Sequence, residues 1–265
     1  AVVIAAPFLL LRSIITNIRT VRNPIHGKSK LITQHLCDNI HDRLNTPYKT
    51  TPTRYAERVL FDAIPRQPAN PLPGVVHLPT FLAPDEQAAL VDQARQLARS
   101  VAGTPVAMRR PQVGNGQMDA WMLSLGWFWA TNPYRMVRHP QVPPIPDNFQ
   151  ALANAALRGA RAIDPLVGPT PRIETALVNF YPPGKGMGAH VDAEEESDNA
   201  VVSLSFGQDA VFRIGGRDIL LMSGDAVVFG GPARRARHAV LGAKRGTSTL
   251  LDGRLNITMR QMEET

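Results

Sequence analysis

The stretch that decides the fold is residues 179–192, which read NFYPPGKGMGAHVD. An apolar run leads into Asn179, a Pro-Pro-Gly turn follows, and His190 and Asp192 then stand two positions apart. Side chains at positions i and i+2 of a β-strand point to the same face of the sheet, so His190 and Asp192 can bind one ion together. We therefore expect a strand that carries two metal ligands.

A second histidine completes a ligand set, because His238 follows Asp192 after 46 residues. Two imidazoles and one carboxylate form the facial triad of non-haem Fe(II) oxygenases, which leaves three coordination positions for a co-substrate and oxygen. The same donors also bind zinc in hydrolases. By itself an HxD pair is more often a surface strand with a solvated His and Asp, so all three interpretations stay open at this point.

The segment 254–260, RLNITMR, favours a binding site. If it is a strand, two arginines, an amide and a hydroxyl share one face, contributed by Arg254, Asn256, Thr258 and Arg260. Burying two unpaired guanidinium groups is costly, and a dicarboxylate is a natural partner for them. The alternative is an edge strand with a solvated basic face.

With these motifs the sequence resembles the AlkB family of Fe(II)- and 2-oxoglutarate-dependent dioxygenases, over about residues 73–262. The resemblance is carried by NFYPPG (179–184), HVD (190–192), GDAVVFGG (224–231), His238 and RLNITMR (254–260). The last of these motifs is the most specific. The resemblance implies an enzyme that uses Fe(II), 2-oxoglutarate and O2.

Carried over residue by residue, the resemblance also implies the roles of the site residues. His190, Asp192 and His238 would bind iron and form the catalytic centre. Arg254, paired with Tyr181, would hold the distal carboxylate of 2-oxoglutarate. The residues lining the site around the keto-acid end would be Asn179, Asn256 and Arg260.

The implied reaction is oxidative demethylation of N-alkylated bases in DNA, which we expect to be single-stranded, with RNA as a further substrate. Decarboxylation of 2-oxoglutarate would be coupled to hydroxylation of the alkyl group and release of an aldehyde. Two alternatives stay open: the same chemistry on a protein or a small molecule, and a jelly-roll binding module without catalysis.

Residues 103–140 resemble the family's nucleotide-recognition lid. Aromatic side chains suit this task because a flipped or single-stranded base can stack on them, at about 1–3 kcal/mol per base. Trp127 is the best stacking candidate, and Tyr134 and Met108 are weaker ones. For Trp127 a place in the core is an equally good interpretation, and we expect Trp121 and Trp129 to pack a core strand.

Charged residues near the motifs also bear on substrate binding. Glu194 falls where bacterial DNA-repair members have an Asp that helps read the base, and we expect Glu195 and Glu196 to form a solvated rim. Arg234 would position the site or the substrate. Two further pairs of arginines are either phosphate contacts or parts of solvated loops. They are Arg109 with Arg110, and Arg235 with Arg237.

Composition supports a mainly β fold with flanking helices and a double-stranded β-helix (jelly roll) core. The chain has 23 prolines and 20 glycines among 265 residues, and short apolar segments at 75–78, 200–207, 210–214, 219–222 and 226–229 are typical of strands. Helices are expected from Pro84, with Leu90, Ala94, Leu97 and Val101 inward, and from Asp147, with Phe149, Leu152, Ala156 and Ala160 inward.

The net charge of +7 is uneven along the chain. Residues 1–66 hold 10 basic and 4 acidic residues, which leaves 19 and 18 in the remainder, so bulk charge says little about the catalytic part. We divide the chain into residues 1–70, a basic extension that is disordered or non-native, and residues 71–265, the dioxygenase domain. A mitochondrial transit peptide is an alternative for the extension.

Only one cysteine occurs, Cys37, so a disulfide within the chain is excluded and a reducing compartment is expected. No uncharged apolar run approaches the length of about 18 residues that a membrane span needs. We expect a monomer in the cytoplasm without membrane association. A mitochondrial or nuclear location stays open if the source is eukaryotic.

Overall fold

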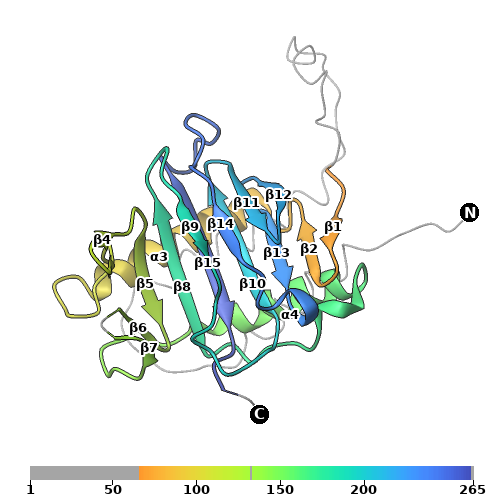
Figure 1. Ribbon diagram of the computed structural model, residues 1–265. Coiled ribbons are helices and arrows are strands. Elements are labelled where there is room, and N and C mark those ends of the chain that lie inside the picture. The colour runs from red at the N-terminus through yellow and green to blue at the C-terminus, as the bar shows by residue number, and fades with distance from the viewer. Residues whose placement is uncertain (1–65, 132, 264–265) are drawn as a thin grey trace, which may run out of the picture. The chain divides into compact units, whose positions relative to one another are not determined.

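The computed structural model describes residues 66–131 and 133–263, which form two antiparallel sheets with helices on one side (Figure 1). The larger sheet has the order β1 (Ala69–Leu72), β2 (Val75–Leu78), β13 (Ala226–Phe229), β10 (Val201–Gly207), β15 (Arg254–Arg260), β8 (Thr175–Tyr181) and β5 (Trp121–Leu125). The smaller sheet has the order β12 (Arg217–Leu221), β11 (Ala210–Ile214), β14 (His238–Val240) and β9 (Met187–His190). The prediction of a mainly β fold with a jelly-roll core is confirmed.

Two short hairpins and two short helical turns complete the fold. The hairpins are β3 (Gln112–Val113) with β4 (Gly116–Gln117), and β6 (Phe128–Thr131) with β7 (Tyr134–Val137). The helical turns are η2 (Pro165–Val167) and η3 (Gly231–Ala233). The predicted strands at 200–207, 210–214, 219–222 and 226–229 correspond to β10–β13, with ends that differ by at most two residues.

β15 lies inside the larger sheet, between β10 and β8, and it has two chemically different faces. Its backbone is paired with β8 along its whole length, from Arg254 opposite Tyr181 to Arg260 opposite Thr175. The apolar residues Leu255, Ile257 and Met259 pack into the core that the helices share. The alternating polar residues therefore face the smaller sheet, as the sequence predicts.

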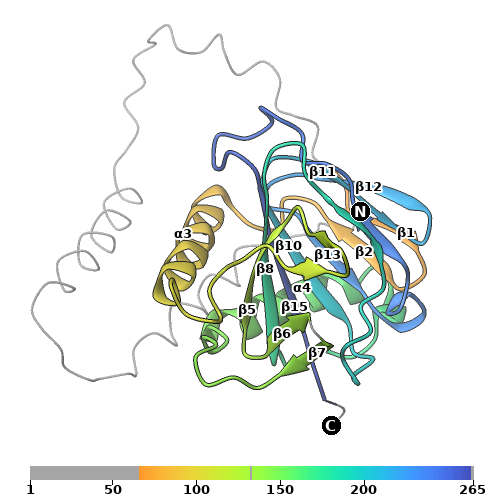
Figure 2. The same cartoon turned by 60° about the vertical axis from the view of Figure 1, so that its left-hand side comes forward.

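The helices α3 (Pro84–Ser100) and α4 (Asp147–Arg161) cover the outer face of the larger sheet (Figure 2). α3 begins where predicted, and the Glu86 carboxylate accepts a 2.8 Å hydrogen bond from the Ala83 N–H in the manner of a capping box. The predicted inward residues are buried except Leu97 and Leu152, which are half-buried. A buried side chain such as Phe149 stabilises the fold by about 1.5–3 kcal/mol. None of the helices in the described ranges is both long and apolar enough to cross a membrane.

The fold begins slightly before the predicted boundary at residue 71. β1 starts at Ala69, and Arg66 already contacts the loop before β13. Residues 1–65, which include Cys37, lie outside the described residues, so the predictions for the basic extension stay predictions.

Asp225 lies in the turn between β12 and β13 and links several segments at the β1–β2–β13 edge of the larger sheet. Its fully buried carboxylate accepts two hydrogen bonds from Arg66, both at 2.6 Å, and lies 2.9 Å from His77 Nε2. The backbone N–H groups of Thr80 and Met222 donate to it at 3.0 and 2.9 Å. Burial raises the pKa of Asp225, but the hydrogen bonds from His77, Arg66 and the backbone outweigh it, so the pKa falls to about 2.

Replacing Asp225 with Asn should therefore destabilise the fold. We expect a loss of about 1.5–3 kcal/mol at pH 7 in urea unfolding, because hydrogen bonds to a charged group are broken. In the wild type, this stabilisation is present above the unfolded pKa of about 4 and is lost as the pH falls toward 2. Asp218→Asn, at an exposed ion pair with Arg213, is the control. An Asp225→Asn protein that unfolds at the wild-type urea concentration would contradict this role.

Candidate active site

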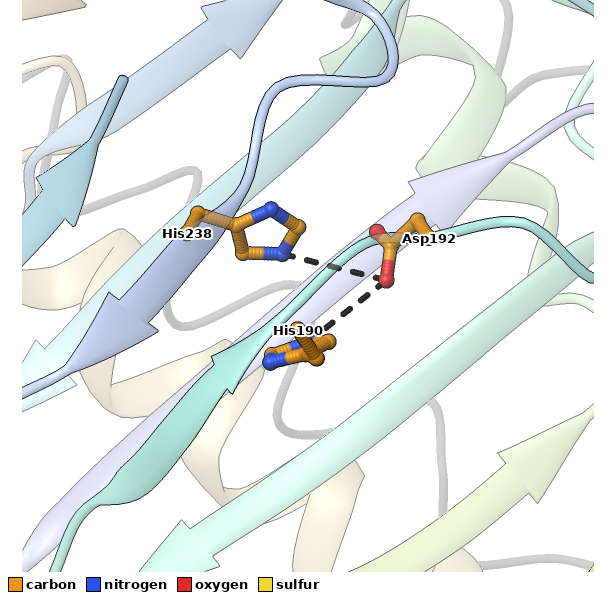
Figure 3. A group of neighbouring side chains, drawn as sticks. All are labelled: His190, Asp192 and His238. Carbon is orange, nitrogen blue, oxygen red and sulfur yellow. Dashed lines mark ion pairs between the residues drawn. The ribbon is translucent and has the colours of Figure 1, made fainter. Parts of the chain in front are cut away.

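Three side chains, from β9, the loop after it and β14, lie close together (Figure 3). His190 ends β9, Asp192 follows two residues later, and His238 begins β14 directly opposite His190 in the strand register. One potential ligand atom of each residue lies within 4.8 Å of the others. Asp192 Oδ1 is 3.7 Å from His190 Nε2 and 3.8 Å from His238 Nε2. The three predicted metal ligands are therefore brought together, although Asp192 lies in the loop after β9 and not on the expected strand.

The protonation of the two imidazoles suits metal binding. His190 Nδ1 lies 2.9 Å from the Gly188 carbonyl, and His238 Nδ1 lies 3.0 Å from the Ala236 carbonyl. A carbonyl oxygen can only accept a hydrogen bond, so each Nδ1 must carry the proton. The lone pair of a neutral ring is then on Nε2, the atom that faces Asp192. This is the tautomer that a metal requires, held by a backbone carbonyl.

Burial of His238 and the positive groups around Asp192 favour the metal-binding charge states of these two ligands. Burial lowers the pKa of His238, although the Asp192 carboxylate opposes it, so the imidazole is favoured in its neutral form. Burial raises the pKa of Asp192, but Arg260 and the two histidines outweigh it, and the pKa stays below its usual range. His190 is the exposed member of the group, with 36% of its side chain accessible. The centre is therefore open to solvent on the His190 side.

A cavity of about 550 Å³ contains the three ligands. Its inner wall is formed by polar residues of β8, β10 and β15, and residues of the hairpin β3–β4 and of β6–β7 lie at its other side. A larger groove of about 640 Å³, beside Arg138 and Arg172, contains none of the three ligands. The cavity is therefore the only one of these two spaces that combines metal ligands with a polar wall.

Arg254 is a buried cation without an anion partner. It is 1% exposed, and its Nη2 donates a 2.9 Å hydrogen bond to Ser205 Oγ, while Nε and Nη1 have no partner. None of the ion pairs among the described residues includes it, and burial lowers its pKa against the opposing effect of Tyr181. An uncompensated buried guanidinium is costly, so this position fits an anionic ligand.

Arg260 differs from Arg254 because two carboxylates of the chain already neutralise it. Its Nη2 lies 2.8 Å from Asp192 Oδ2, and its Nη1 donates a 2.6 Å hydrogen bond to Glu195 Oε1. Burial lowers the pKa of Arg260, but Asp192 and Glu195 outweigh it and hold the pKa above its usual value. The sequence predicts that both arginines need an external anion. Of the two, only Arg254 lacks a carboxylate partner in the described part of the chain.

The polar residues between the two arginines are largely paired with one another. Asn256 Nδ2 donates to Ser203 Oγ at 2.7 Å and to the Leu204 carbonyl at 2.9 Å, and Thr258 Oγ1 donates to Asn256 Oδ1 at 2.8 Å. Asn179 reaches Asn256 at 3.4 Å, and its own buried Oδ1 has no partner. Asn256 therefore stiffens the cavity wall, and Asn179 has one amide atom available to a ligand.

Among the predicted substrate residues, Tyr134 and Glu194 line the cavity, whereas Trp127, Met108 and Arg234 do not. The Arg138 guanidinium lies over the Trp127 ring at 4.0 Å, and Met108 packs against the helix-side core. Arg234 is buried behind the cavity and paired with Glu195 at 3.1 Å. These three residues therefore lie outside the cavity of the metal ligands, and their part in substrate binding stays a prediction.

Trp129, which the sequence interpretation placed in the core, faces the cavity instead. It lines the cavity, and its ring centroid lies 5.6 Å from that of Tyr134. The register of the hairpin pairs Thr131 with Tyr134 and Trp129 with Met136, so Trp129 and Tyr134 are diagonal neighbours on one face. The Asn132-Pro133 dipeptide, which is typical of turns, is the sequence signal that could have revealed this hairpin. Trp121 is likewise not in the core, since it is 42% exposed.

The charged loops also differ from expectation. Glu195 is 3% exposed and forms two buried ion pairs, so it is not part of a solvated rim, whereas Glu196 is exposed. Arg109 and Arg110 donate to the carbonyls of Trp129 and Met118, at 2.9 and 2.8 Å, and so brace the two hairpins. Arg235 pairs with Asp198 at 2.9 Å, and Arg237 is exposed. Of these cations, Arg237 alone has the exposed, unpaired character that phosphate contacts would use.

Comparisons with known proteins agree with this geometry. The model of the 2OG-Fe(II) oxygenase superfamily matches residues 74–260. An alpha-ketoglutarate-dependent dioxygenase AlkB homolog of Caulobacter vibrioides is 34% identical over 74% of this chain and 90% of its own. The DNA N(6)-methyladenine demethylase ALKBH1D of Arabidopsis thaliana is 30% identical over 71% of this chain and 49% of its own. The solved structure of OsALKBH1 superposes with a TM-score of 0.66 and 27% identity, over 74% of this chain and 100% of its own.

The match to the family model includes all three metal ligands, both cavity arginines and every strand of the larger sheet from β2 onward. The Caulobacter relative adds 34% identity over most of its length. The chain therefore belongs to the AlkB family of Fe(II)- and 2-oxoglutarate-dependent dioxygenases.

Proposed function

We propose that this dioxygenase removes alkyl groups oxidatively from the bases of single-stranded DNA. The observation that carries the proposal is one cavity in which the metal ligands, an unpaired guanidinium and an aromatic pair are all exposed to the same space. A metal and an anionic co-substrate supply oxidation, and an aromatic pair supplies a surface for a planar base.

His190 Nε2, His238 Nε2 and Asp192 Oδ1 would hold Fe(II), because these atoms face one another and the Nδ1 atom of each ring is hydrogen-bonded to a backbone carbonyl. Arg254, opposite Tyr181 in the sheet, would bind the distal carboxylate of 2-oxoglutarate. When bound, the iron with 2-oxoglutarate and O2 supplies the oxidation of an alkyl C–H bond. The protein orients the reactants and excludes water from the buried end of the cavity.

The substrate side of the cavity suits a base that has left its stack. Trp129 and Tyr134 offer two ring faces, and Tyr134 is 48% exposed. The Glu194 carboxylate on the same cavity wall would accept a hydrogen bond from a base amino group. Single-stranded DNA is favoured as substrate because extrusion of an unpaired base costs least. Relatives named as DNA demethylases and as RNA demethylases both support a nucleic acid substrate, and the preference for DNA is our proposal.

The direct test is aldehyde release from a methylated single-stranded oligodeoxynucleotide with Fe(II), 2-oxoglutarate and O2. The unmodified oligonucleotide and the methylated RNA of the same sequence are measured alongside. We expect stoichiometric aldehyde and succinate from the methylated DNA, and less from the RNA. Succinate formation without aldehyde from either nucleic acid would indicate a protein or small-molecule substrate instead.

Arg254→Ala should raise the KM for 2-oxoglutarate by about 10–100-fold, because about 1.5–3 kcal/mol of charge-assisted hydrogen bonding is lost. The KM for the oligonucleotide should stay near the wild-type value. Arg172→Ala, at an exposed ion pair with Glu174, is the matched control. An unchanged KM for 2-oxoglutarate in Arg254→Ala would show that a different anion occupies this position.

Trp129→Ala should raise the KM for the methylated oligonucleotide by about 5–150-fold, which corresponds to the loss of one stacked base at about 1–3 kcal/mol. Its KM for 2-oxoglutarate should not change. Trp127→Ala serves as the matched variant, because Trp127 lies outside the cavity beneath Arg138. A larger loss of oligonucleotide binding in Trp127→Ala than in Trp129→Ala would contradict the stacking assignment.

A further inference from the structure

Four charged side chains form a closed ring behind the metal-binding carboxylate. Asp192 Oδ2 lies 2.8 Å from Arg260 Nη2, and Arg260 Nη1 lies 2.6 Å from Glu195 Oε1. Glu195 Oε2 accepts a 3.1 Å hydrogen bond from Arg234 Nη2, and Arg234 Nη1 donates at 3.3 Å to the backbone carbonyl of Asp192. The series of contacts thus begins and ends at Asp192.

The ring is shielded from solvent. The side-chain exposures are 5% for Asp192, 8% for Arg260, 0% for Glu195 and 2% for Arg234. Two cations and two anions balance within it. Three of its four contacts are directional hydrogen bonds from the fixed fork of a guanidinium, and the fourth, between Arg260 and Asp192, is an ion pair. Such a ring resists rotation of any one of its members.

Glu195 is the member that joins the two arginines. Each arginine holds Asp192 at a different point, Arg260 at Oδ2 and Arg234 at the backbone carbonyl, to which Arg235 Nη1 also donates at 2.9 Å. Asp192 is therefore fixed at both ends, and Oδ1 is the carboxylate oxygen that faces both imidazoles. The Glu195 carboxylate pairs with the two arginines and forms no ion pair with either histidine in the described part of the chain, so its influence on the metal centre is indirect.

We propose that Glu195 is a positioning residue that determines which oxygen of Asp192 meets the metal. Without its charge, two buried guanidinium groups would face a single carboxylate, and their mutual repulsion would act beside a divalent cation. Arg260 would then be free to draw Asp192 away from the imidazoles. The proposal rests on the metal site of the proposed function and is independent of the substrate being nucleic acid.

The test uses Mn(II) as the probe, with the free ion measured by electron paramagnetic resonance during titration of the metal-free protein. Glu195→Gln keeps the size of the side chain and removes its charge. We expect its affinity for Mn(II) to fall by about 10–100-fold, the usual effect of losing a partner behind a metal ligand. Glu196→Gln, the exposed neighbour, should bind Mn(II) like the wild type.

The titration separates positioning from a general loss of structure. It is run well below the melting temperature of each metal-free variant, so a merely structural role would lower melting and leave Mn(II) affinity unchanged. If Glu195→Gln does not fold, Arg234→Lys is titrated instead, because lysine keeps the charge but cannot contact both Glu195 and the Asp192 carbonyl. Wild-type Mn(II) affinity in the folded variant would overturn the proposal.

The outcome is also distinguishable from that of the proposed function. If Mn(II) affinity falls in Glu195→Gln and no nucleic acid yields aldehyde with the wild type, the positioning role stands and the substrate assignment falls. If the wild type demethylates DNA and Glu195→Gln binds Mn(II) normally, only the positioning role falls.

Discussion

A buried guanidinium that no carboxylate of the described chain neutralises is the constraint on which this site depends. Arg254 is nearly inaccessible to solvent, and two of its nitrogen atoms have no hydrogen-bond partner. A buried charge without a partner destabilises the fold, so we infer that Arg254 is retained to bind a ligand. A small dianion fits both the charge and the geometry of this position. Arg260 differs, because two internal carboxylates neutralise its charge, although its Nε also has no hydrogen-bond partner, so of the two cavity arginines only Arg254 carries an uncompensated charge.

The two sheets place the unpaired Arg254 guanidinium in the same cavity as the metal ligands. β15 carries both arginines and continues the helix-side core on its other face, so the stability of the fold and the polarity of the cavity depend on one strand. The opposite sheet contributes both histidines through strands paired at His190 and His238. The backbone carbonyls of Gly188 and Ala236 then set the tautomer of each ring. Hydrogen bonding by the main chain thus prepares the ligands before any metal binds.

The sequence predicted those parts of the site that depend on local periodicity. Alternation placed Arg254, Asn256, Thr258 and Arg260 on one face, and the HxD spacing brought His190 and Asp192 together. Short strands and glycine-rich turns predicted the jelly roll. The alternation along β15 follows from the two-residue repeat of a strand. Asp192 lies beyond the end of β9 at His190, so a loop, and not a continued strand, brings it beside His190.

The missed parts depend on contacts between segments that are distant in sequence or separated by turns. Whether Trp127 or Trp129 faces the cavity is set by where the hairpin β6–β7 begins, and a shift of one residue reverses the faces. Glu195 looked solvated because its neighbours are acidic, yet it pairs with Arg234 and Arg260, which lie 39 and 65 residues away. Composition within a loop therefore did not reveal its burial.

The most direct measurement of the central claim is the visible spectrum of the protein with Fe(II) and 2-oxoglutarate under anaerobic conditions. A metal held by His190, Asp192 and His238 beside a diacid held by Arg254 predicts a weak charge-transfer band that appears only when both additions are present. A spectrum without this band in the folded protein, or one that persists unchanged when His238 is replaced by Ala, would contradict the account.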